Sequence, residues 1–322
     1  MTALKQALEG VKTVVILGHV HPDGDCIGAC LGLYNYLETA YPEIKADLYL
    51  EDRNERISYL KNFDKIQTVP ADRIYDLCVC LDASDRERLG EFTVLLDRAV
   101  SSLCVDHHVT NTRYAKENVI EEQASSCCEV LYCQMDEMFI TRETGECLYT
   151  GMIHDTGVFK HSNTSGRTMM IAGKLMDKGI DFGKIIDDSF YRKTYVQNQI
   201  LGRALLESIV FLHGKCIFSA IRAKDMDFYG VTSKDLDGIV DQLRVTEGVE
   251  CAIFMYETGV QEYKISLRSN SYLDVSKIAQ YFGGGGHVRA AGCTMSGSLH
   301  DVVNNLSAQI EKQLENKPCI TE

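Results

Sequence analysis

The chain has 322 residues, 45% hydrophobic and 25% charged with only four prolines, which is the composition of an ordinary globular protein rather than a disordered or fibrous one. This length exceeds what one hydrophobic core usually serves, so we expect two domains. The net charge of −13 argues against tight binding to long duplex DNA, which needs many basic side chains, but allows a short nucleotide held by a few local cations.

The first 190 residues alternate short apolar runs with helical patterns, which predicts an α/β domain with a mostly parallel sheet. Its expected strands are Thr13–Leu17, Asp47–Leu50, Leu77–Leu81 and Ser102–Val105. Its expected helices are Ile27–Thr39, Ile57–Lys61, Cys127–Glu137, Thr144–Ile153 and Ser165–Lys178. Gly179 stands where the cap of the last helix belongs. We assign residues 1–190 to this domain.

The remaining sequence predicts a linker and a smaller α+β domain. Residues 191–213, with the helix-like run Tyr195–Phe211, are the expected helical linker, and residues 214–322 are the expected second domain. Its strands should be Cys216–Ile221, Glu250–Tyr256 and Glu262–Leu267, the last two forming a hairpin around Thr258 and Gly259. Its helices should be Val275–Phe282, capped by Asp274, and Leu299–Leu314. We expect an active-site cleft between the two domains.

The sequence predicts a cytoplasmic protein without membrane contact. No run approaches the roughly 20 apolar residues of a membrane span, and the N-terminus lacks the small-residue cleavage site of a signal peptide. The 13 cysteines are odd in number, and several lie inside apolar runs, such as Cys78, Cys80 and Cys104. We interpret them as reduced core residues. Cys26 and Cys30 have no partner pair at zinc-finger distance, so we expect no structural zinc site.

Polar residues gather where three of the expected strands end. After the first, third and fourth strands the chain places His19, Asp23 and Asp25, then Asp82, then Asp106, His107 and His108. Ligands of open α/β sheets bind outside the carboxyl ends of strands, so these side chains should meet at one edge, and Asp155 would close the ring. Taken singly, each is better explained as a turn, a helix cap or an ordinary histidine. Their joint placement favours a site.

Several carboxylates with two or three histidines favour a metal site. A Ser-His-Asp triad is disfavoured, because no serine lies in a nucleophile-elbow context such as G-x-S-x-G. Hard divalent ions prefer carboxylate, imidazole and water ligands, and the absence of cysteine from the set weakens zinc. Two ions about 3.5–4 Å apart that share a carboxylate would stabilise the attacking and leaving oxygens of a displacement on phosphorus. We predict two divalent ions, Mn²⁺ first, with Mg²⁺ or Co²⁺ as alternatives.

The second domain offers candidate substrate contacts. Glycines run from Gly283 to Gly286, and His287 follows them. Without side chains in the way, their backbone N–H groups could donate hydrogen bonds to a phosphate or sugar, and His287 would add a donor. Alone this is a weak signal, because glycine runs are usually flexible loops. Arg268 ends an expected strand and would either grip a phosphate or form a surface salt bridge. The predicted substrate contacts are Arg268, Gly284, Gly285, Gly286 and His287.

The ordered motifs resemble those of the DHH phosphoesterases, in particular the subgroup with a DHH and a DHHA1 domain that includes bacterial oligoribonuclease/pAp phosphatases and cyclic-dinucleotide phosphodiesterases. The matching motifs are His19-x3-Asp23-x-Asp25-x2-Gly28, Leu81-Asp-Ala-Ser-Asp85, Asp106-His107-His108, Gly151-Met-Ile-His-Asp155-Thr-Gly157 and, for DHHA1, Gly283 to Gly292. One departure is Ala29, where the family usually has a serine that is not a ligand.

The resemblance implies a role for each residue of the site. One metal would be held by His19, Asp23 and Asp82, and the other by Asp25, Asp82, His107 and Asp155, with Asp82 as the bridge. Asp106 would orient His107, and His108 would face the scissile phosphate. The implied substrates are nanoRNA or linear dinucleotides, pAp and cyclic dinucleotides. The choice among them, the cleavage polarity, the native metal and the oligomeric state stay open, with a homodimer as the default.

Three alternatives remain at the level of sequence. A family II inorganic pyrophosphatase shares the DHH motifs, but the glycine-rich signature at Gly283–His287 speaks against it. A RecJ-type DNA exonuclease is disfavoured by the length and acidity of the chain. A non-catalytic nucleotide sensor predicts missing ligands, whereas every expected ligand position is filled.

Overall fold

The computed structural model describes residues 1–315, and the last residues of the expected second domain, 316–322, lie outside this range. The chain divides into two compact units, the first ending at Arg192 and the second beginning at Lys193. No helix within the described range is long and apolar enough to cross a membrane.

The first unit is built on a six-stranded parallel sheet with the strand order β3-β2-β1-β4-β5-β6. The strands are β1 (Thr13–Leu17), β2 (Lys45–Tyr49), β3 (Ile66–Gln67), β4 (Leu77–Leu81), β5 (Ser101–Asp106) and β6 (Glu117–Ile120). The chain adds strands outward from β1 in one direction and then restarts at β4 on its other side. In such sheets the carboxyl ends of the two strands at this switch point flank the ligand site.

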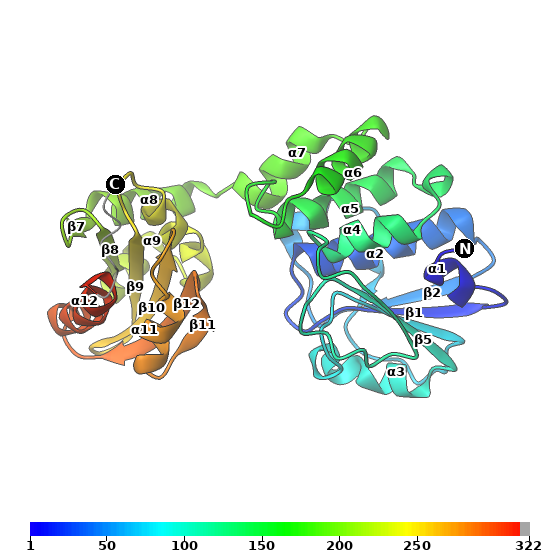
Figure 1. Ribbon diagram of the computed structural model, residues 1–322, viewed down its shortest axis with the longest axis horizontal. Helices are drawn as coiled ribbons and strands as arrows, with labels where there is room; N and C mark the ends of the chain where they lie inside the picture. The colour runs from blue at the N-terminus through cyan, green and yellow to red at the C-terminus, as the bar shows by residue number, and fades with distance from the viewer. Residues whose placement is uncertain (316–322) are drawn as a thin grey trace. The chain divides into compact units, whose positions relative to one another are not determined.

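Helices cover both faces of this sheet. They are α1 (Ala3–Ala7), α2 (Gly24–Ala40), α3 (Thr93–Arg98), α4 (Cys127–Gln134), α5 (Arg142–Asp155), α6 (Gly166–Asp177) and α7 (Phe182–Ile186). Figure 1 shows α2, α4 and α5 on one face and α3 on the other. Accordingly Val14 and Ile16 are buried in one core cluster, and Val15 and Leu17 in another. Burial on both sides makes β1, β4 and β5 apolar runs, which is why the sequence predicted these strands. The less buried strands β3 and β6 were not predicted.

One predicted helix in this unit is wrong. Residues 57–61 do not form a helix: a short 3₁₀ turn covers Glu55–Ile57, and Asn62 is left-handed with φ 65°. The apolar spacing of Ile57 and Leu60 suited a helix, but both side chains reach the core from a turn. The predicted cap at Gly179 is confirmed by its φ of 81° directly after α6 and its C-cap residue.

The second unit has a six-stranded mixed sheet with the order β11-β12-β10-β9-β8-β7, in which only β8 and β9 are parallel. The strands are β7 (Ile209–Phe211), β8 (Cys216–Ile221), β9 (Cys251–Gly259), β10 (Glu262–Ser269), β11 (Gly285–His287) and β12 (Ala290–Ser296). The helices are α8 (Tyr195–Leu206), α9 (Ala223–Tyr229), α10 (Ile239–Arg244), α11 (Val275–Tyr281) and α12 (Leu299–Glu315). The predicted hairpin of β9 and β10 is confirmed, and so is the cap of α11 by Asp274.

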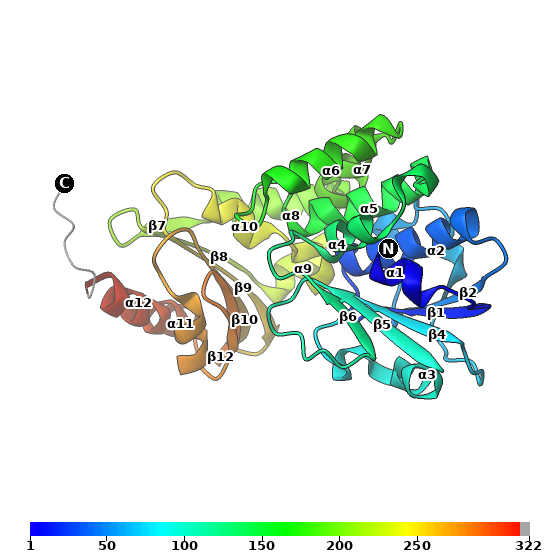
Figure 2. The same cartoon turned by 45° about the vertical axis from the view of Figure 1, so that its right-hand side comes forward.

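The helices of this unit also lie on both faces of their sheet (Figure 2). Ile253 is buried in a cluster with residues of α11 and α12, whereas its neighbour Phe254 is buried in a cluster with residues of α8 and α10. Alternation along β9 therefore fills both cores. The short helices α9 and α10 and the strands β11 and β12 were not predicted from the sequence.

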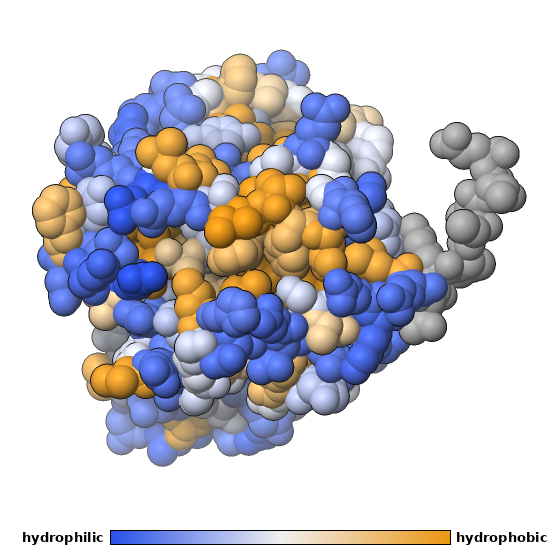
Figure 3. Space-filling model, turned by 90° about the vertical axis from the view of Figure 1, so that its left-hand side faces the viewer, coloured by the Kyte–Doolittle hydropathy of each residue, from blue (hydrophilic) through white to orange (hydrophobic). Residues whose placement is uncertain are grey.

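The segment expected as a linker holds α8 and the edge strand β7. Ile200 and Ala204 of α8 are buried in the second unit, and the predicted helix stops at Leu206 instead of continuing to residue 211. Ile209 and Val210 of β7 are about half exposed, at 53% and 52%. Figure 3 shows apolar side chains gathered on this side of the molecule. An open strand edge with exposed apolar residues is a surface on which another chain can pair.

Candidate metal centre

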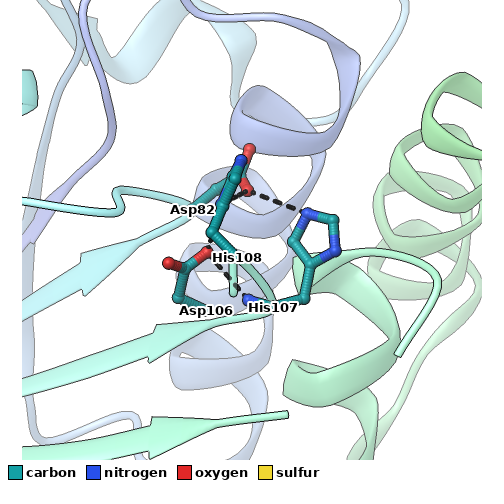
Figure 4. Close-up of side chains that lie close together, drawn as sticks. All are labelled: Asp82, Asp106, His107 and His108. Carbon is teal, nitrogen blue, oxygen red and sulfur yellow. Dashed lines mark hydrogen bonds and ion pairs between the residues drawn. The ribbon is translucent and has the colours of Figure 1, made fainter. Parts of the chain in front are cut away.

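The carboxyl ends of β1, β4 and β5 bring imidazoles and carboxylates together. Asp82, which follows β4, lies between two histidines: its Oδ2 is 3.4 Å from His19 Nε2, and its Oδ1 is 3.6 Å from His107 Nε2. Figure 4 shows Asp82 beside the Asp106, His107 and His108 side chains that follow from β5. This is the place that a carboxylate shared by two ions would take.

Asp82 has a strained backbone and an unsatisfied oxygen. Its φ is 57°, in the left-handed region that Asp adopts more readily than most residues. Its N–H donates to Val105 O at 3.2 Å, which fixes the turn. The residue is only 2% exposed, and its buried Oδ1 has no hydrogen-bond partner. An unpartnered buried oxygen costs free energy, and a cation between the carboxylate and the imidazoles would remove that cost.

Backbone N–H groups fix the two aspartates of the first motif. Asp23 caps α2, because its Oδ1 accepts from the N–H groups of Asp25 and Cys26 at 3.0 Å each. Asp25 is fully buried, and its carboxylate accepts from Cys127 N at 2.6 Å and Cys128 N at 3.0 Å. These donors are the first N–H groups of α4, where the helix dipole favours negative charge. Asp25 is therefore held rigidly toward the centre.

Asp155 reaches the centre from the last turn of α5, with its Oδ2 3.1 Å from His107 Nε2. Asn163 Nδ2 donates to Asp155 O at 3.2 Å and to Ser125 O at 2.9 Å, so one amide ties the end of α5 to the segment before α4. The range Gly157–Phe159 contains three consecutive left-handed residues with φ of 56°, 58° and 61°. Such strain persists only where the surroundings enforce it, and it is common beside functional sites.

The potential ligand atoms form three overlapping groups, one of which joins Asp82 to Asp106, His107 and His108. In the second group, Asp25, His107 and Asp155 place one ligand atom each within 4.8 Å of one another. The third group contains His19 and Asp82, and Asp23 Oδ1 lies 3.7 Å from His19 Nε2. All six residues predicted as metal ligands thus lie at this edge of the sheet. A set of carboxylates and imidazoles fits divalent metal ions.

One cysteine lies beside the predicted ligand set. Cys26 Sγ lies within 4.8 Å of ligand atoms of His19 and Asp82, and it accepts a hydrogen bond from His19 N at 3.3 Å. Position 26 lies in the first turn of α2, three residues after the cap Asp23, so the side chain turns back toward the loop after β1. Helical spacing from the cap was the signal that would have indicated it.

Asp106 organises the DHH tripeptide, but not as the resemblance implied. Its Oδ1 accepts from His107 N at 2.8 Å and lies 2.7 Å from His108 Nδ1, while Asn111 Nδ2 donates to Oδ2 at 2.6 Å. Asp106 therefore orients the ring of His108, and it touches His107 only through the backbone. With Nδ1 engaged, the 39%-exposed His108 side chain has Nε2 left for other groups.

The charges of the cluster perturb one another strongly. Burial raises the pKa of Asp82 to about 6. Burial acts to lower the pKa of His107, but the hydrogen bond with Asp155 and the charge of Asp25 outweigh it and raise that pKa to about 10. Burial, together with Asp82 and Asp155, raises the pKa of Asp25 well above its ordinary value. So many carboxylates in one buried place require positive charge, which divalent ions would provide.

In the second unit, Arg268 and His287 share one row of the sheet. Arg268 of β10 and His287 of β11 are both paired with Ala290 of β12, so the two lie two strands apart in register. Arg268 Nε is 3.5 Å from Asp241 Oδ1, which is the salt bridge that the sequence left open. The Arg268 side chain is still 30% exposed.

Comparisons with known proteins match both units. The DHH family, N-terminal domain, matches residues 13–152, and the DHHA1 domain matches residues 213–316. The chain belongs to the DHH family. It is 28% identical over 301 residues to the bifunctional oligoribonuclease and PAP phosphatase NrnA of Thermus thermophilus, covering 91% of this chain and 86% of the relative. It is 28% identical over 327 residues to the protein of the same name from Mycoplasma genitalium, covering 96% and 98%.

A solved structure shares the whole fold. The exopolyphosphatase-related protein from Bacteroides fragilis superposes with a TM-score of 0.84 at 24% identity, covering 96% of this chain and 94% of the other. At this level of identity the likeness shows that the two chains have the same fold.

Two glycines of the DHHA1 run are also required by backbone packing, in addition to their predicted role in substrate binding. A Cβ on Gly284 would lie 2.1 Å from Gly292 O, and Gly286, with φ 141°, would place one 2.5 Å from Ala290 O. Both glycines therefore allow close packing of backbone against β12. The predicted loop is in part a strand, because Gly285–His287 forms β11, and Gly285 is exposed with open space around it.

Sequence reasoning missed four polar residues at the DHH centre: Cys26, Arg88, Asn111 and Asn163. Asn111 follows the tripeptide by three residues, and Asn163 lies in the polar stretch after Asp155. The contacts of Arg88, Asn111 and Asn163 cross between loops, so no local pattern indicates these three residues.

Proposed function

We propose that the chain is a two-metal phosphoesterase that hydrolyses short nucleotides to mononucleotides. The observation that carries the proposal is Asp82, a buried carboxylate between His19 and His107 with one oxygen that lacks any hydrogen-bond partner. The relatives named oligoribonuclease and PAP phosphatase support linear dinucleotides or nanoRNA and pAp as substrates. Cyclic dinucleotides are the further candidate. Mn²⁺ is the proposed metal, with Mg²⁺ and Co²⁺ as alternatives.

His19, Asp23, Asp25, Asp82, His107 and Asp155 would hold the ions, which when bound would neutralise phosphate charge and lower the pKa of a water nucleophile. His108 is the proposed proton donor or hydrogen-bond donor to the phosphate. Its bond to Asp106 raises its pKa, so the imidazolium form is favoured and Nε2 carries a proton toward the reacting group. Asp106 keeps that ring oriented, and Asn111 keeps Asp106 oriented.

We propose that Arg268, Gly284, Gly285, Gly286 and His287 of the DHHA1 domain bind the nucleotide. Because partners across a strand pair lie on one face, Arg268 and His287 form a row of side-chain donors suited to a phosphate or sugar. The open edge of β7 is the surface we propose for a homodimer. The twelve cysteines of residues 1–315 are all unpaired, which supports the cytoplasm as the compartment; Cys319 lies outside that range.

A substrate panel tests the proposal. The Mn²⁺-loaded full-length chain is incubated in parallel with pAp, pApA, cyclic di-AMP and pyrophosphate, and bound metal is measured on the same sample. We expect AMP from pApA, AMP and phosphate from pAp, and no phosphate from pyrophosphate. Metal-loaded protein that releases nothing from any nucleotide would show a sensor rather than an enzyme, and cleavage of pyrophosphate alone would show a family II pyrophosphatase.

A further inference from the structure

Arg88 is held at the rim of the metal centre by backbone contacts. Its N–H donates to Asp85 Oδ1 at 3.0 Å, and its carbonyl accepts from Val20 N at 2.7 Å. These bonds tie the loop after β4 to the loop after β1. The guanidinium Nη2 lies 3.1 Å from His19 Nδ1. The chain therefore anchors an arginine directly beside a predicted metal ligand.

The Arg88 guanidinium is not ion-paired with a carboxylate, although its charge acts on Asp85 from a longer distance. In residues 1–315 its contact is with His19, and no carboxylate oxygen lies within ion-pair distance of it. Arg86, two residues earlier, instead forms an ion pair with Asp97 at 2.5 Å. The planar guanidinium of an arginine that is not paired with a carboxylate can donate two parallel hydrogen bonds to the oxygens of a phosphate.

The contact between Arg88 and His19 is incompatible with metal binding through His19 Nε2. Nδ1 of His19 lies 2.8 Å from Val20 O and 3.1 Å from the Arg88 guanidinium, and it can donate to the first or accept from the second, but not both. A neutral imidazole that gives its Nε2 lone pair to a metal carries its hydrogen on Nδ1. It then donates to Val20 O, and Arg88 loses its acceptor.

We propose that Arg88 is a phosphate-binding residue of the DHH domain, released from His19 when metal binds and then gripping the non-bridging oxygens of a phosphate monoester or diester at the centre. This inference rests on the proposed function for its substrate, but phosphate binding can be measured without turnover. Arg88 would provide a positively charged side chain for an anionic ligand at a centre that is otherwise acidic.

The test compares Arg88→Ala with Arg86→Ala as the matched control in the full-length chain. Calorimetry measures Mn²⁺ binding to the metal-free protein and AMP binding to the Mn²⁺-loaded protein, and kinetics on pApA give KM and kcat. For Arg88→Ala we expect AMP affinity to fall at least about tenfold with a matching rise in KM, because charge-assisted bonds are lost. Mn²⁺ affinity should be equal or higher, because a competitor for Nδ1 is gone. Arg86→Ala should behave like the unchanged chain.

Two results would overturn the inference. One is unchanged AMP affinity in Arg88→Ala. The other is weaker Mn²⁺ binding without loss of AMP affinity, which would show that Arg88 only positions His19. Thermal unfolding of both metal-free variants controls for folding, and Arg88→Lys, which keeps the charge but not the fork, should recover part of the AMP affinity. If no nucleotide is cleaved but AMP binding still depends on Arg88, the proposed function fails and the phosphate site stands.

Discussion

The two domains hold their candidate functional groups in opposite ways. In the DHH domain Asp25, Asp82 and Asp106 are at most 2% exposed, and each is fixed by a backbone bond or an imidazole. In the DHHA1 domain Arg268 is part-exposed with a single ion pair, and His287 is exposed on a short edge strand. Substituting one of the interacting buried charges should therefore cause a large loss of metal binding and turnover. Substituting an exposed donor on the DHHA1 sheet should affect only substrate affinity.

The largest effect should come from the buried bridge. For Asp82→Asn we expect turnover to fall about 10³-fold or more, because the neutral amide cannot serve two cations and several kcal/mol of charge stabilisation is lost. Mn²⁺ affinity, measured by calorimetry, should fall in parallel.

Asp76→Asn is the matched control for this variant, because Asp76 precedes β4 whereas Asp82 follows it. Among residues 1–315 the Asp76 carboxylate accepts hydrogen bonds from Lys12 and Thr13, at the opposite end of β1 and β4 from the predicted ligands. The Asp76→Asn substitution should lower the stability of the protein without changing its affinity for Mn²⁺. Near-normal turnover in Asp82→Asn would show that the two proposed ions do not share this carboxylate.

A smaller loss of turnover is expected when all predicted metal ligands are kept and His108 loses the carboxylate that orients its ring. Asp106→Asn removes the charge that orients His108, so we expect kcat to fall about 100-fold, within the range of general acid catalysis. Mn²⁺ affinity should change less than in Asp82→Asn, since Asp106 contacts His107 only through its backbone. If Asp106→Asn lost metal as completely as Asp82→Asn, Asp106 would itself be a ligand.

The difference between the domains also explains what the sequence could predict. The central strands β1, β4 and β5 of the DHH domain are buried and are followed by polar residues, so these strands and the gathering of His19, Asp82 and Asp106 follow from local pattern. The partner of Asp106 was predicted incorrectly, because the sequence does not show which neighbouring imidazole turns toward it.

In the DHHA1 domain the decisive contacts join distant segments. Arg268, Ala290 and His287 share a row only because β10 and β11 flank β12, a strand that the small-residue run 288–292 did not reveal. The close approach of Gly284 to Gly292 is likewise invisible in a run of four glycines, which is as typical of a loop.

Stability of the DHHA1 domain should depend on a buried carboxylate that has no catalytic role. Glu250 accepts from the N–H groups of Ser271, Tyr272 and Leu273 and from the Ser271 hydroxyl. Burial acts to raise the pKa of Glu250, but these bonds outweigh it and lower the pKa below 4.5. Glu250→Gln should cost about 1–3 kcal/mol of unfolding free energy at neutral pH, because bonds to the charged group are lost.

The sign of the pH dependence follows from the lowered pKa. The stabilisation by Glu250 is present above pH 4.5, the ordinary value, and is lost as the pH falls through the lowered folded value. The free energies of unfolding in urea of the unchanged chain and of Glu250→Gln should therefore differ at neutral pH and converge in acid. Hydrogen exchange in β9 should show that the change lies in the DHHA1 domain. A difference that persists in acid, or a loss of Mn²⁺ affinity, would contradict the assignment.

The smallest effect should come from the exposed row of the DHHA1 domain. For Arg268→Ala we expect KM for pApA to rise about tenfold, or about 1.4 kcal/mol, with kcat within about twofold, because the residue would bind ground state and transition state alike. Arg244→Ala is the control, since Arg244 also lies 3.5 Å from Asp241 Oδ1 but adds a bond to Asn270. If both variants raised KM equally, loss of the pairing to Asp241 would be the cause. A rise confined to Arg268→Ala would assign the phosphate contact to Arg268, whereas a fall in kcat with KM unchanged would place this arginine at the reacting phosphate, like the buried residues of the DHH domain.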